Sequence, residues 1–262
     1  MKELLKTSFV LANKNIVLAC MLVIFSIVTS VYVAVSQSLS GGAASQALVL
    51  YVLALIAFFA GFFNQVKAVV NNDEGKMKFL EGVGEYFLPM SGICVISLIS
   101  YLVVGLLASL ITVNIYGGVE PVMSAMNKVL SVVQNSAADT SSIDVQTVQI
   151  VLTMVLILWA FWGLLSFVLL YWVPVLYFDN VRNIFVSFWQ GLKFLFKTFW
   201  KSLLIFILAV LAICIIGFLS AISSSLALLE VLLSMFNYYI ILVFVFAVFL
   251  LYKKQIQEKV EE

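Results

Sequence analysis

Six uninterrupted apolar stretches, each long enough to cross a lipid bilayer, dominate the sequence. A transmembrane helix needs about 20 mostly apolar residues, and the stretches lie at 16–36, 47–66, 90–116, 147–178, 202–220 and 226–252. Of the 262 residues, 64% are hydrophobic and 10% are charged, which is more apolar surface than a soluble chain of this length can bury. We therefore predict an all-α polytopic membrane protein: one transmembrane domain over 1–262, a six-helix bundle with interfacial amphipathic helices.

The positions of lysine and arginine predict the orientation. Positive residues favour the cytoplasmic side of a membrane. They occur before the first span, between the second and third, between the fourth and fifth, and after the sixth; Lys128 is the one exception among 14. We therefore predict a multi-pass protein of a prokaryotic cytoplasmic membrane with both termini in the cytoplasm.

The segment FWQGLKFLFKTFWKSLL, residues 188–204, combines lysines with aromatic and leucine side chains. Polar residues at helical spacing form one stripe: Asn183, Ser187, Gln190, Lys193, Lys197 and Lys201. Such a helix is expected to lie in the headgroup plane, with its lysines toward cytoplasmic water and anionic lipid. Two roles stay open for these lysines and Arg182. They either anchor the topology, or they recruit a specific lipid or an acidic partner protein.

Similar amphipathic segments precede the first, third and fifth spans. They are LLKTSFVLANKNIVL, FLEGVGEYFLPMSGI and FWQGLKFLFKTFWKSLL. Three repeated units, each an interfacial helix followed by a transmembrane hairpin, explain this pattern, because internal repeats are common in membrane proteins. Any amphipathic helix that leads into a span has the same pattern, so duplication and coincidence both stay open.

Several residues predict local structure at the ends of the spans. The loop VEPVMSAMNKVLSVVQ is expected to form a short amphipathic helix with Pro121 near its start. Asp144 is expected to cap the fourth span, and Asn64 and Gln65 to cap the second. Pro174 is expected to kink the fourth span or to mark its end.

Polar side chains are rare within the spans, and the candidate intramembrane site is in the sixth. Glu230 lies near the outer end, where it reaches the interface or faces a polar cavity. Asn237 and Tyr238 lie closer to mid-membrane. An asparagine there forms a hydrogen bond across a helix interface or contacts a substrate.

The residues that common enzymes need are missing. The chain has no histidine, so Ser–His and Cys–His nucleophile systems and histidine zinc sites are excluded. The three cysteines lie on separate spans, and no P-loop motif occurs. We therefore expect no catalytic residue, no metal and no cofactor. A net charge of +1 provides no nucleic-acid-binding face.

The region WVPVLYFDNVRNIFVSFWQGLKFLFKTFWKSLLIFI places Pro174 near the end of a span, then Asp179, then a small residue at Ser187 or Gly191, then the basic stretch. In this pattern the chain resembles a prokaryotic group of six-span integral membrane proteins of unknown function, similar to the membrane domain found beside some glycerophosphodiester phosphodiesterases. The resemblance implies six spans. It implies no catalytic residue, because no phosphodiesterase domain is present.

These observations favour a non-catalytic integral membrane protein that organises lipid or supports a membrane complex. The alternative is a permease-like facilitator or transporter subunit for a lipid or a small neutral solute. The alternative requires a cavity at membrane depth lined by residues such as Asn237 and Tyr238.

Overall fold

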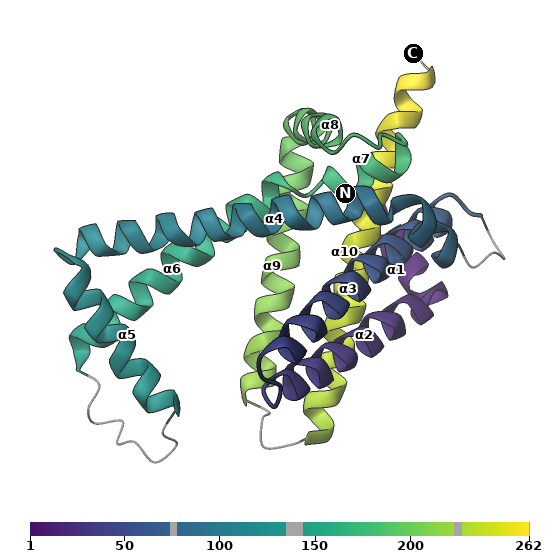
Figure 1. The fold of residues 1–262 in the computed structure, drawn as a ribbon. Helices are drawn as coiled ribbons and strands as arrows, with labels where there is room; N and C mark the ends of the chain where they lie inside the picture. Colours follow the sequence, from purple (N-terminus) through teal and green to yellow (C-terminus); the bar gives the residue numbers. More distant parts are fainter. Residues whose placement is uncertain (74–77, 135–143, 223–226, 262) are drawn as a thin grey trace. The chain divides into compact units, whose positions relative to one another are not determined.

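The computed structural model describes residues 1–73, 78–134, 144–222 and 227–261, and these are α-helical apart from short connections (Figure 1). The helices are α1 Lys2–Lys14, α2 Ile16–Ser36, α3 Gly42–Val70, α4 Phe79–Ile115, α5 Val119–Gln134, α6 Val145–Val168, α7 Trp172–Phe178, α8 Ile184–Lys197, α9 Phe199–Ile222 and α10 Ala227–Glu261. Six helical stretches are long and apolar enough to cross a membrane. The predicted all-α, multi-pass membrane protein is therefore confirmed.

The chain folds into two compact units. Unit 1 comprises Met1–Ile93 and Leu169–Glu262, and unit 2 comprises Cys94–Val168. The helix α4 contributes its first part to unit 1 and the remainder to unit 2. Large apolar side chains along the spans stay exposed, as expected where lipid is the solvent; Leu50 and Leu102, for example, are 68% and 61% exposed.

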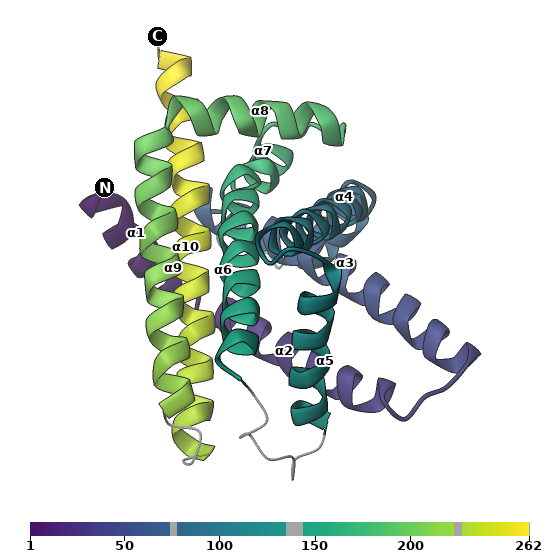
Figure 2. The same cartoon turned by 90° about the vertical axis from the view of Figure 1, so that its left-hand side faces the viewer.

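The core of unit 1 is built around α10. Its residues Leu242, Val243, Phe246 and Phe249 are buried against α1, α2 and α3, whose buried members of the same cluster are Ala12, Leu18, Ala19, Leu22, Phe62, Val66 and Val70. Both views show α9 running beside α10, and α8 lying across the end of this pair (Figures 1 and 2). The orientation of α8 relative to α9 and α10 is the one an interfacial helix takes beside two spans.

The amphipathic segments before the spans are not equivalent. The first is separated from its span at Asn15 and the third at Thr198, where the backbone leaves helical dihedrals. In both residues the backbone N–H and the side chain donate to the carbonyl four residues earlier. Asn15 donates to the carbonyl of Leu11, and Thr198 donates to that of Phe194. The second segment is not separate, because α4 continues unbroken from Phe79. These bonds do not by themselves break a helix, because Thr112 and Asn114 make the same bonds within the unbroken α4.

The fourth predicted span is interrupted. The helix α6 ends at Val168, a turn occupies 169–171, and α7 follows. Pro174 therefore does not kink a continuous helix. It lies in the first turn of α7, where a missing N–H breaks no helical hydrogen bond.

Unit 2 is held by a small core and a few hydroxyl contacts. The predicted amphipathic helix is confirmed as α5, and its Val122 and Ala125 are buried with Ile150 of α6. The hydroxyls of Tyr101 and Tyr116, both on α4, lie 2.8 Å from those of Ser166 and Thr153 on α6.

The predicted cap of the fourth span is also confirmed. Asp144 Oδ1 accepts the N–H of Thr147 at 2.7 Å, and its Oδ2 accepts from Lys128 Nζ at 3.0 Å. Hydrogen bonds from Thr147, and after them the one from Lys128, lower the pKa of Asp144 to about 2.

Candidate functional site at the lysine-rich end of unit 1

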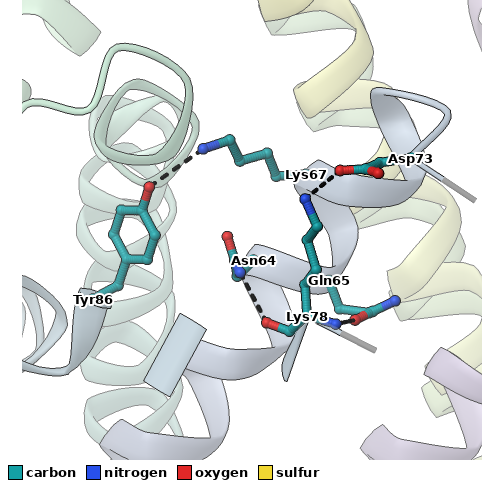
Figure 3. A network of polar contacts seen from close by, with 6 residues as sticks. All are labelled: Asn64, Gln65, Lys67, Asp73, Lys78 and Tyr86. Carbon is teal, nitrogen blue, oxygen red and sulfur yellow. Dashed lines mark hydrogen bonds and ion pairs between the residues drawn. The ribbon is translucent and has the colours of Figure 1, made fainter. Parts of the chain in front are cut away.

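A network of polar contacts joins the end of α3 to the segment before α4 and to Tyr86 of α4 (Figure 3). Asn64 Nδ2 donates to the backbone carbonyl of Lys78 at 2.8 Å, and the Lys78 N–H donates to Gln65 Oε1 at 2.8 Å. The prediction that Asn64 and Gln65 end the second span was wrong, because α3 continues to Val70. The two amides instead fix the start of the next helix against α3.

A second set of contacts joins α3, α4 and the segment after α7. Lys67 Nζ lies 3.3 Å from the Tyr86 hydroxyl, which donates to Asn180 Oδ1 at 2.7 Å. Asn180 adopts the left-handed conformation that commonly follows a helix, with φ of 53°. Arg182 lies 3.9 Å from Glu85 in an exposed ion pair, which contributes little to stability. Of the residues expected to contact lipid or a partner, Arg182 is therefore the one already paired.

Tyrosine hydroxyls connect the remaining helices at this end. Tyr252 of α10 donates to Asp179 Oδ2 at 2.7 Å, and Tyr177 of α7 donates to the carbonyl of Ala60 at 2.8 Å. Lys253 Nζ donates to the carbonyl of Val70, the last residue of α3, at 2.7 Å. A helix end carries unsatisfied carbonyls and partial negative charge, so this lysine stabilises the end of α3.

The helix α8 has three distinct faces. Its buried face contains Ser187, whose hydroxyl accepts from Trp172 Nε1 at 2.9 Å, and Gly191, which packs on the backbone of Tyr171. The exposed face opposite is aromatic: Phe185 is 73%, Trp189 56% and Phe196 68% exposed. Lys193 and Lys197 are exposed beside this aromatic face. The predicted polar stripe was therefore partly wrong, because its member Ser187 faces the protein.

A pocket of about 280 Å³ lies under α8, and we call it the α8 pocket. Its lining residues are Asp179, Gln190, Lys193, Phe194, Lys197 and Tyr252. Gln190 Oε1 has no hydrogen-bond partner within the described residues, so no bond holds this amide in one orientation. Two of the three predicted lysines thus meet in one cavity.

The third lysine of the stripe lies elsewhere. Because the helix breaks at Thr198, Lys201 belongs to α9 and lines a separate pocket of about 500 Å³, the α1 pocket. Its charged lining residues are Glu3, Lys201, Lys253 and Lys254, and its apolar lining includes Leu4, Leu11, Val70, Leu250 and Leu251. Lys253 and Lys254 were not among the residues predicted to contact lipid or a partner. Their position as a lysine pair directly after the sixth span was the available signal.

Within the part of the chain that the structure describes, the lysines of the two pockets form no ion pair with an acidic side chain. Ion pairs within the described residues join Lys78 to Asp73, Lys128 to Asp144 and Arg182 to Glu85. None of them involves a lysine of the α8 pocket or the α1 pocket. Lys193 lies 5.7 Å from the centre of the Trp189 ring, a cation–π contact that leaves its charge uncompensated.

The candidate intramembrane residues are only partly brought together. Glu230 and Tyr238 line a pocket of about 290 Å³ between α2 and α10, with Ser26, Ser30 and Ser234. Asn237 is not among its lining residues. Its Oδ1 is buried and makes no hydrogen bond within the described part of the chain, so the predicted bond across a helix interface is not seen.

No protein-family model, curated protein or solved structure matches this chain. Of the resemblance to six-span prokaryotic membrane proteins, the structure supports the six long apolar helices.

Proposed function

We propose that this is a non-catalytic membrane protein whose lysine-rich end binds anionic phospholipid headgroups, and thereby organises lipid or supports a membrane complex at that surface. In this proposal the lysine-rich end and both termini face the cytoplasm. The observation that carries it is the pair of pockets lined by five lysines, none of which is ion-paired within the described residues.

Charge and geometry support lipid as the ligand of this end. Each lysine near a negatively charged leaflet contributes about 1 kcal/mol to attraction. The exposed aromatic face of α8 matches the apolar face by which interfacial helices enter the headgroup region. The lysines beside that face are then at headgroup level, where phosphate oxygens accept hydrogen bonds from ammonium groups.

Lipid retention tests this proposal. The protein is transferred into mixed micelles that contain equal amounts of phosphatidylglycerol and phosphatidylcholine, and the bound lipids are counted by native mass spectrometry. We expect wild type to retain phosphatidylglycerol in preference, and the double variant Lys193→Gln, Lys197→Gln to lose a large part of that preference. Lys128→Gln is the control, because Lys128 is ion-paired in unit 2. Equal retention of both lipids by wild type would contradict the proposal.

Cysteine labelling tests the proposed orientation. In a background without Cys20, Cys94 and Cys214, Gln257→Cys is expected to react with an impermeant thiol reagent only from the cytoplasmic side. Asn127→Cys, on the exposed side of α5, is expected to react only from outside. The opposite labelling pattern would show that the protein has the opposite orientation in the membrane.

A facilitator is the second candidate, and the pocket that contains Glu230 and Tyr238 supports it. A carboxylate and three serine hydroxyls line a cavity on a span, and ionisable residues there commonly mark transport pathways. Solute uptake into liposomes that contain the protein, compared with Glu230→Gln, tests this candidate. If Glu230→Gln transports as well as wild type, or if liposomes with the protein take up no more solute than empty ones, the pocket no longer supports a facilitator.

A further inference from the structure

The first helix forms a wall of the α1 pocket. It lies along α10: Asn13 Oδ1 accepts from the Tyr239 hydroxyl at 2.7 Å, and the ring of Phe9 lies 6.4 Å from that of Tyr239. At the other end of α1, Glu3 and Leu4 face the pocket together with Leu250, Leu251 and the lysine pair of α10. The pocket is therefore bounded by helices on several sides rather than by one exposed patch of lysines.

The two pockets at the lysine-rich end differ in charge. Counted over side chains alone, the α1 pocket has three lysines and one glutamate, a charge of +2, whereas the α8 pocket has two lysines and one aspartate, a charge of +1. In the α8 pocket the aspartate already accepts a hydrogen bond from Tyr252. In the α1 pocket no ion pair joins Glu3 to a lysine within the described residues.

The α1 pocket also combines its charge with apolar surface. Leucines from α1 and α10, together with Val70, line it beside the ammonium groups. Leucines beside ammonium groups match the junction between a lipid headgroup and its acyl chains, whereas a free phosphate ion would leave this apolar wall without a contact. The volume of about 500 Å³ is nearly twice that of the α8 pocket, at about 280 Å³.

We propose that the α1 pocket binds a phospholipid whose headgroup carries two negative charges, with its phosphate oxygens on Lys201 and Lys254 and the start of an acyl chain against the leucines. This inference rests on the proposed function and makes it more specific. The α8 pocket, with one net positive charge, takes singly charged headgroups. Lys253 contributes charge, but its bond to Val70 also holds the end of α3.

Lipid competition tests the proposal. Protein in neutral mixed micelles is titrated with cardiolipin, which has two phosphates, with phosphatidate, a phosphomonoester, and with phosphatidylglycerol. We expect wild type to prefer one or both of the doubly charged lipids over phosphatidylglycerol by about fivefold, since one additional charge contact adds about 1 kcal/mol. The double variant Lys201→Gln, Lys254→Gln is expected to lose this preference. Lys193→Gln, Lys197→Gln is expected to keep it.

The charge-preserving variant Lys201→Arg, Lys254→Arg separates a binding role from a folding role. It is expected to keep the preference for doubly charged lipid, and its melting temperature and that of the glutamine variant should both equal that of wild type. A glutamine variant that keeps the preference would overturn the assignment. If inorganic phosphate displaces cardiolipin as effectively as phosphatidate does, the assignment of a lipid as the ligand is overturned.

The outcomes also separate this inference from the proposed function. If wild type binds doubly and singly charged lipids with equal affinity and does not bind phosphatidylcholine, only the two-charge assignment is contradicted. Equal affinity for all lipids, phosphatidylcholine included, would contradict both.

Discussion

The two units join their helices in different ways. In unit 1 helices approach closely at glycines: a Cβ added to Gly82 would lie 2.8 Å from the carbonyl oxygen of Ala60, which is too close, and one on Gly191 would make a tight contact of 3.1 Å with the carbonyl carbon of Tyr171. In unit 2 a Cβ added to Gly105 or Gly163 would meet nothing within 4 Å. Membrane helices gain little from apolar burial against each other, so close backbone approach and interhelical hydrogen bonds supply much of the cohesion. We infer that unit 1 is the more rigid unit.

The largest expected effect is that of Gly82→Ala. The added methyl group overlaps α3, and overpacking of this kind costs about 1–3 kcal/mol. We expect a clear fall in the melting temperature in detergent. Gly163→Ala is the matched control in unit 2. It is expected to leave the melting temperature unchanged or slightly raised, because alanine is the better helix former. Equal losses from both variants would contradict the difference between the units.

A smaller effect is expected from the removal of tyrosine hydroxyls. Tyr252→Phe removes the bond to Asp179 from a side chain that is 4% exposed, and we expect a loss of about 1 kcal/mol. Tyr101→Phe removes the contact with Ser166 in unit 2, where the side chains are less buried, and a smaller loss is expected. Denaturation curves of the two variants measure the difference, and a larger loss for Tyr101→Phe would reverse the comparison.

The smallest expected effect is a pH dependence confined to unit 2. The pKa of Asp144 is lowered to about 2 from an ordinary value of 3.8. A lowered pKa in the folded state means that the carboxylate stabilises the start of α6 above about pH 4, and that this stabilisation is lost as the pH falls towards 2. Hydrogen exchange at the start of α6, corrected for the intrinsic pH dependence, should therefore increase over this range. Asp144→Asn is expected to abolish the pH dependence and to keep the cap.

The spans, the α5 helix and the Asp144 cap could be predicted from the sequence, because each depends on residues close together in the chain. The break at Thr198 was missed, because the periodicity of Lys193, Lys197 and Lys201 continues through it. The composition of the pockets could not be predicted either. Tyr252 and Asp179 are 73 residues apart, and Glu3 and Lys254 line one pocket only because α1 packs on α10. Hydropathy identifies which segments enter the membrane and contains no information on which of them become neighbours.

The contact between α1 and α10 has a consequence for biosynthesis. Asn13 and Tyr239 are 226 positions apart, and the core of unit 1 draws four of its buried residues from 242–249. Four of the 11 buried residues of this core are therefore still missing when the first five apolar segments have left the ribosome. Until α10 emerges, α1 and α2 lack the helix on which they pack. In contrast, α5 and α6 can pair as soon as both have emerged. A chain that stops before the last helix therefore lacks the α10 side of the unit 1 core.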